Sequence, residues 1–215
     1  MVGALPPVPI APPAAPVPLV PPVPPASVAV VPPPRRSLEA GGARWGGVRS
    51  WYEDVLGWPT VPGAPPRLRV GVRFDVLDVP AEAGRAALER LGPTGPVAVR
   101  GERMLLLVAA GGAEEVPGLL EWLEWGSLPL DLTVVGTGGV MDAPLAPATG
   151  PGSGPDGPRG AACWLRPPEP GCEVETSLPA LSVVGGAGTA PDLARLVRTL
   201  ATQCHRVRLR AGRGR

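Results

Sequence analysis

The placement of proline near the start of the chain limits its fold more than any other feature. From residue 6 to residue 25, consecutive prolines are never more than three positions apart. Proline lacks a backbone N–H and its ring clashes with the preceding turn of a helix, so this segment is restricted to polyproline II or coil. We therefore predict a disordered leader rich in Pro, Val and Ala over residues 1–37. It serves either as a spacer or as a ligand for an aromatic groove on a protein partner.

The apolar character of this leader raises the question of a membrane span. The same prolines exclude a continuous helix, and no basic segment precedes them, so we expect neither a membrane span nor a signal peptide. The chain has three cysteines, an odd count that favours reduced thiols over a disulfide framework. Together these observations predict a cytoplasmic protein.

After the leader, the spacing of apolar residues alternates between helical and extended patterns. Apolar residues three and four apart predict helices at residues 38–57, 81–91 and 113–125 and from about Pro191 onward. Alternating or short apolar runs predict strands at 69–79 and 131–135, and a hairpin of 97–99 with 104–109. Residues 146–160 show no periodicity and are expected to form a loop. This order predicts one α+β domain over residues 38–205, with a small, mostly antiparallel sheet flanked by helices.

Charge is distributed unevenly along the chain. Residues 193–215 hold seven Arg and no acid, whereas residues 38–192 hold 11 Arg against 19 Asp and Glu, a net charge of −8. An acidic body does not favour wrapping duplex nucleic acid, because affinity there comes mainly from cations on phosphates. The basic tail, residues 206–215, is either a solvated terminus or a contact for single-stranded nucleic acid through Arg206, Arg208 and Arg210. No Trp lies in this tail to stack on bases.

Three aspartates lie at predicted strand positions and are the candidate metal ligands. Asp75 and Asp78 belong to the first long strand, and Asp131 begins a later one. Convergence of such carboxylates at one sheet edge would suit the divalent ions of phosphoryl or nucleotidyl transfer. Asp75 and Asp78 are an odd number of residues apart, however, so a regular strand points them to opposite faces, and only a bulge or the strand end near Pro80 would bring them together.

Several segments, taken in order, resemble the bifunctional DNA primase/polymerase (prim-pol) domain of the archaeo-eukaryotic primase superfamily. The resemblance covers roughly residues 45–205 and suggests a short bacterial member. The segments that carry it are Trp51-Tyr52 with Gly57–Pro62, Phe74–Pro80 with Gly84 and Leu88, Val99–Leu107, Asp131–Pro144, and Trp164–Pro168. Each motif taken alone has low specificity.

The resemblance implies an active site built on four groups. In the family, the first motif supplies two metal-binding acids two residues apart, the second a His that contacts nucleotide phosphates, and the third another metal-binding Asp. Asp78 matches the first acid and Asp131 the last, with Asp75 nearby as a further candidate ligand. Pro80 replaces the second acid, and Met104 stands at or beside the position of the His.

Two functions remain open from this pattern. One is nucleotidyl transfer from nucleoside triphosphates to a nucleic-acid end, with Mg²⁺ or Mn²⁺ held by Asp78 and Asp131, weakened or lost because two groups are replaced. The other is a non-catalytic regulatory protein that binds nucleic acid or protein through the basic tail or the Pro-rich leader.

Overall fold

The structure is a computed structural model, and it describes residues 45–92, 94–145, 161–171, 174–181 and 192–213. The predicted leader, residues 1–37, and the predicted loop, residues 146–160, lie outside the described residues. The α+β class is confirmed, because helices and antiparallel strands occur together in one domain.

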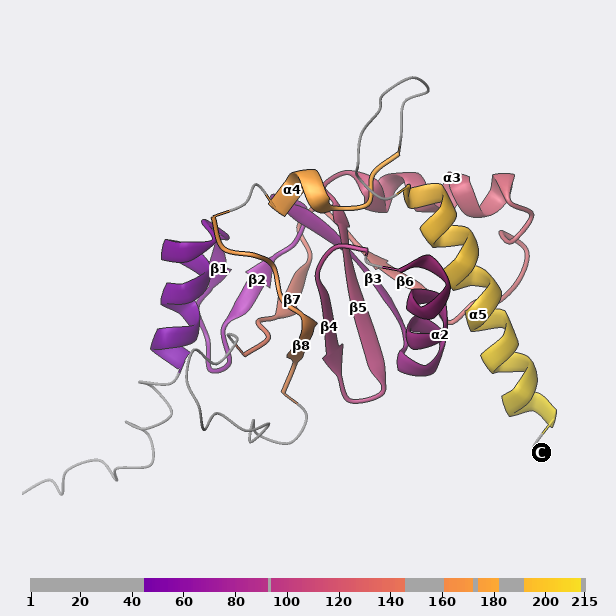
Figure 1. Ribbon diagram of the computed structural model, residues 1–215, viewed down its shortest axis with the longest axis horizontal. Helices are drawn as coiled ribbons and strands as arrows, with labels where there is room; N and C mark the ends of the chain where they lie inside the picture. Colours follow the sequence, from indigo (N-terminus) through magenta and orange to yellow (C-terminus); the bar gives the residue numbers. More distant parts are fainter. Residues whose placement is uncertain (1–44, 93, 146–160, 172–173, 182–191, 214–215) are drawn as a thin grey trace, which may run out of the picture. The chain divides into compact units, whose positions relative to one another are not determined.

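The described part of the chain contains the following elements (Figure 1). Residues 45–50 are helical and continue into a short π-helix, η1 (Trp51–Val55). The other helices are α2 (Ala81–Leu91), α3 (Gly112–Trp122), α4 (Val174–Ser177) and α5 (Leu193–Arg213). The strands are β1 (Thr60–Val61), β2 (Arg67–Arg69), β3 (Phe74–Pro80), β4 (Val97–Arg100), β5 (Arg103–Ala109), β6 (Thr133–Val135), β7 (Val140–Asp142) and β8 (Cys163–Arg166).

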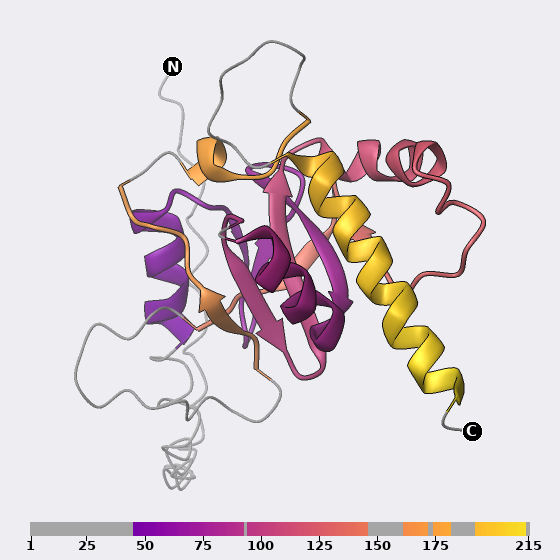
Figure 2. The same cartoon turned by 45° about the vertical axis from the view of Figure 1, so that its right-hand side comes forward.

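Two antiparallel sheets organise these elements. The larger has the strand order β6-β3-β5-β4-β8, and the smaller has the order β1-β2-β7. Helices α2, α3 and α5 pack on one face of the larger sheet, and Figure 2 shows α2 and α5 side by side across it. The smaller sheet, the helical segment 45–55 and α4 pack against the opposite face. The larger sheet is therefore the middle of three layers.

Side-chain alternation along the central strands creates a core on each face of this sheet. Leu77 and Val79 of β3 belong to the cluster beneath the three helices, and Phe74 and Val76 belong to the cluster beneath the smaller sheet. The period-2 geometry of a strand explains this division. It also fixes the direction in which each polar residue of β3 points.

Two predicted segments differ from the structure. The single strand predicted at 69–79 is two strands, β2 and β3, joined by a turn in which Gly71 has a φ of 86°. A Cβ atom at Gly71 would lie 2.2 Å from the Cα atom of Thr137, so both the backbone angle and the close approach require glycine. The basic residues 206–213, part of the predicted tail, are helical and belong to α5.

None of the described helices combines the length and the apolar character needed to cross a bilayer.

Candidate functional site

Asp78 and Asp131 are brought together by one arginine, Arg103. The Nε atom of Arg103 donates to Asp78 Oδ1 at 2.7 Å, and its Nη1 atom donates to Asp131 Oδ1, also at 2.7 Å. The Nη2 atom donates to the backbone oxygen of Asp78 at 3.0 Å. The two predicted metal ligands therefore share a cation, and that cation is a guanidinium group.

The register of the larger sheet explains how Arg103 reaches this position. Strands β3 and β5 are antiparallel, with Pro80 opposite Arg103 and Asp78 opposite Leu105. Asp78 and Arg103 are diagonal cross-strand neighbours on the same face, a distance that a long side chain can span. Asp131 precedes β6, the strand that pairs with the other edge of β3 through Asp78 and Thr133. Its carboxylate thus lies at the same end of the sheet.

The three side chains differ in exposure. The exposed fraction is 17% for Asp78, 27% for Arg103 and 60% for Asp131. Burial by itself would lower the pKa of Arg103, but its hydrogen bonds to Asp131 and Asp78 outweigh that effect and raise the pKa. The guanidinium therefore stays charged, and it neutralises one of the two carboxylates that surround it.

A second ion pair lies at the other side of the same hairpin turn. Arg100 is paired with Arg103 in the β4–β5 register, and its Nη1 atom lies 3.0 Å from Asp142 Oδ2 on β7. The β4–β5 hairpin thus presents two arginines to three carboxylates, one of which comes from the smaller sheet.

Asp75 does not join this group. It lies on the opposite face of β3 and is 1% exposed, and its Oδ2 atom accepts a hydrogen bond from the backbone N–H of Ala113 at 2.9 Å. Asp75 therefore caps the first turn of α3 from a neighbouring strand, a position favoured by the helix dipole. Its Oδ1 atom is buried and has no hydrogen-bond partner among the residues that the structure describes. Over the described ranges, no three His, Cys, Asp or Glu side chains are grouped to hold a metal ion.

Pro80 and Met104, which stand where the primase/polymerase family would have its second acid and its His, offer no polar group to the site. Met104 is fully buried in the core between β5 and α2, on the face of the sheet opposite Asp78. Pro80 ends β3 and caps α2. Neither side chain can supply an oxygen ligand to Mg²⁺ or Mn²⁺ or donate a hydrogen bond to a phosphate.

The three arginines predicted to contact nucleic acid have different environments on α5. The Nη1 atom of Arg208 donates to the backbone oxygen of Pro129 at 2.6 Å, and the Nη1 atom of Arg210 lies 2.9 Å from Glu82 Oε1 on α2. Arg206 is exposed and contacts no described polar group. Two of the three are thus engaged within the domain.

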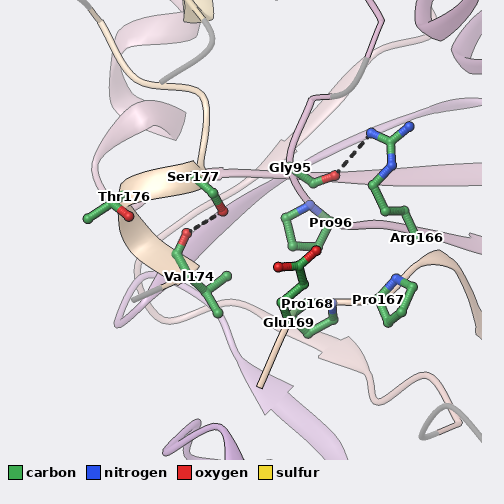
Figure 3. Close-up of a pocket in the computed structure, with 9 residues that line it drawn as sticks. All are labelled: Gly95, Pro96, Arg166, Pro167, Pro168, Glu169, Val174, Thr176 and Ser177. Carbon is green, nitrogen blue, oxygen red and sulfur yellow. Dashed lines mark hydrogen bonds between the residues drawn. The ribbon is translucent and has the colours of Figure 1, made fainter. Parts of the chain in front are cut away.

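A surface pocket of about 360 Å³ lies elsewhere, between the start of β4, the end of β8 and α4 (Figure 3). Its lining residues are Gly95, Pro96, Arg166, Pro167, Pro168, Glu169, Val174, Thr176 and Ser177. The Nη1 atom of Arg166 donates to the backbone oxygen of Gly95 at 3.4 Å, and the Ser177 hydroxyl donates to the backbone oxygen of Val174 at 2.7 Å. None of the three predicted aspartates lines this pocket.

Comparisons of the chain with protein-family models, with curated proteins and with solved structures find no match.

Proposed function

We propose that this chain is a non-catalytic protein with the architecture of a primase/polymerase domain, and that it acts by binding nucleic acid. The observation that carries the proposal is the guanidinium group of Arg103 between Asp78 and Asp131. In an active nucleotidyltransferase, a divalent ion would be expected to occupy the space between such carboxylates.

The donor set supports this proposal because it does not fit Mg²⁺ or Mn²⁺. A divalent ion on Asp78 and Asp131 would have to displace Arg103 from three charge-assisted hydrogen bonds, two of them to carboxylates. Displacement would also leave the guanidinium without its partners beside a doubly charged ion. Hard cations take six or more oxygen ligands, whereas Pro80 and Met104 supply none. Asp78 and Asp131 are therefore better suited to an ion pair than to a metal centre.

The binding part of the proposal rests on charge. Helix α5 carries six Arg and no acid between Leu193 and Arg213, in a protein whose remaining body is acidic. Polyanions are attracted by such a segregated basic element, and nucleic acid is the polyanion that the primase/polymerase resemblance favours.

A primer-extension assay with Mn²⁺ tests the loss of catalysis. The full-length protein is compared with the double variant Asp78→Ala, Asp131→Ala on the same primed template and nucleoside triphosphates. We expect no incorporation that depends on these two residues. Equal traces in both preparations would indicate a contaminating polymerase and would support the proposal. Incorporation by the original protein that the double variant lacks would overturn it, and would assign nucleotidyl transfer to the Asp78–Asp131 pair.

A further inference from the structure

We infer that the solvent face of α5, formed by Arg195, Arg198, Arg206 and Arg213, is a binding surface for single-stranded nucleic acid. This inference rests on the proposed function and names the surface and the type of strand. It differs from the sequence-based prediction, which placed the contact on Arg206, Arg208 and Arg210.

The geometry of α5 places these four arginines in one row. At about 100° per residue, their positions fall within an arc of about 80° around the helix axis, so all four share one face. The opposite face is buried in the core through Leu193, Leu196, Val197, Leu200, Ala201 and Cys204. At 1.5 Å per residue, the row is about 27 Å long. A single strand can follow such a row with several consecutive phosphates.

The other two arginines of the helix have a different role. Arg208 lies on another side of the helix and contacts the backbone of Pro129, and Arg210, at the edge of the arginine face, contacts the carboxylate of Glu82. They tie the C-terminal half of the helix to the rest of the domain. The four guanidinium groups of the solvent row make no hydrogen bond or ion pair with any residue that the structure describes. They are therefore available to phosphates.

Aromatic rings lie beside this row, although no Trp is near it in sequence. The ring of Trp125 packs edge-on against His205, with centroids 5.7 Å apart, and Arg206 follows directly on the helix. Leu209 is 49% exposed one turn further along the same flank, and Leu128 is 38% exposed after Trp125. Base faces are exposed in single strands and stack on such rings, whereas paired bases in a duplex do not.

The nearby acids restrict the path of the strand. Glu121 and Glu124 are exposed on the segment that carries Trp125, and Asp192 precedes α5, where it accepts a hydrogen bond from the backbone N–H of Ala194. Phosphates are repelled from these positions and attracted to the arginine row. The bases are thus directed toward Trp125 and His205, and the backbone toward the row.

Fluorescence anisotropy with a labelled 15-nucleotide oligothymidine tests the inference on the full chain. The variant Arg198→Gln, Arg206→Gln removes half of the row, and the variant Arg67→Gln, Arg69→Gln removes two exposed arginines of β2 as a control of equal charge. Each lost phosphate contact reduces the slope of log affinity against log salt by roughly 0.7 for single strands. We therefore expect the slope to fall by about 1.4 in the α5 variant and to be unchanged in the control.

The outcomes separate this inference from the proposed function. Equal slopes in the two variants, with binding by the original protein, would overturn the α5 surface while the proposed function stands. No binding by the original protein at low salt would overturn both. An abasic oligomer of the same length tests stacking without altering the protein: the inference predicts weaker binding by roughly fivefold or more. Equal binding of the two oligomers, or a preference for duplex, would contradict single-strand recognition.

Discussion

Gly84 of α2 lies directly against Met104 of β5: a Cβ atom at Gly84 would be 2.3 Å from the Met104 Sδ atom. Both residues are buried in the core beneath the helices. Position 104 therefore serves the packing of α2 on the sheet, on the face away from Asp78 and Asp131.

The substitution Gly84→Ala should destabilise the protein. Overpacking of a filled core costs about 1–3 kcal/mol, which exceeds the gain of up to about 1 kcal/mol in helix propensity. Gly118→Ala on α3 is the matched control, since its added methyl group has no described neighbour within 4 Å apart from the adjoining backbone of its own helix. Urea denaturation should show a lower free energy of unfolding for Gly84→Ala and an unchanged or higher one for Gly118→Ala. Stabilisation by both substitutions would contradict the packing described.

Glu124 should be replaceable by glycine with a gain in stability. Its φ is 65°, and the hydrogen bonds Glu124 N to Glu121 O and Trp125 N to Leu120 O form a Schellman-type end of α3. The left-handed conformation costs a side-chain-bearing residue about 1–2 kcal/mol, part of which is offset by the entropy of glycine in the unfolded chain. We expect thermal unfolding to show stabilisation by about 0.5–1 kcal/mol.

The same substitution at Glu115, an exposed position inside α3, should have the opposite effect. Glycine in a helix interior costs about 0.5–1 kcal/mol. A loss of stability at both positions would indicate that Glu124 is not in the left-handed conformation.

Tyr52, the single tyrosine of the chain, should resist ionisation in the folded state. Burial raises its pKa well above 10.0, and the hydrogen bond donated by Trp164 Nε1, at 2.9 Å, only partly opposes this. The Tyr52 hydroxyl donates to the backbone oxygen of Pro144 at 2.8 Å, so it is needed in its neutral form. Absorbance near 295 nm during a pH titration reports this residue alone. The tyrosinate signal should appear only together with unfolding, and a normal titration near pH 10 in the folded protein would contradict the buried site.

The sign of the stability change follows from the direction of this shift. Because the folded-state pKa lies above the unfolded value, the contribution of Tyr52 is complete below about pH 10 and is lost as the pH rises further. The free energy of unfolding should fall by about 1.4 kcal/mol per pH unit more steeply than in Tyr52→Phe over that range.

Sequence patterns predicted the ends of a helix or strand best where a proline or a glycine stands at each end. Helix α2 has the bounds predicted for it, because Pro80 precedes it and Gly92, with a φ of 76°, ends it. The strand predicted at 69–79 was wrong because Val70, Val72 and Phe74 continue the alternation through a turn. Only Gly71 indicated that turn, and its contact with Thr137 is a tertiary one.

The candidate site was predictable in part. The odd spacing of Asp75 and Asp78 indicated opposite faces, and the structure places them so. Arg103 was missed, because the sequence pattern assigns the residues between the two strands of the hairpin only to a turn. The register of β3 with β5, which depends on contacts distant in sequence, puts Arg103 opposite Pro80 and within reach of Asp78.

Binding of Mn²⁺ measured by electron paramagnetic resonance tests the central claim most directly. If Arg103 is the cation of the Asp78–Asp131 pair, the original protein and the double variant Asp78→Asn, Asp131→Asn should deplete free Mn²⁺ to the same extent. A bound ion present in the original protein and absent in the double variant would contradict the claim, because the carboxylates would then prefer a metal ion to the guanidinium of Arg103.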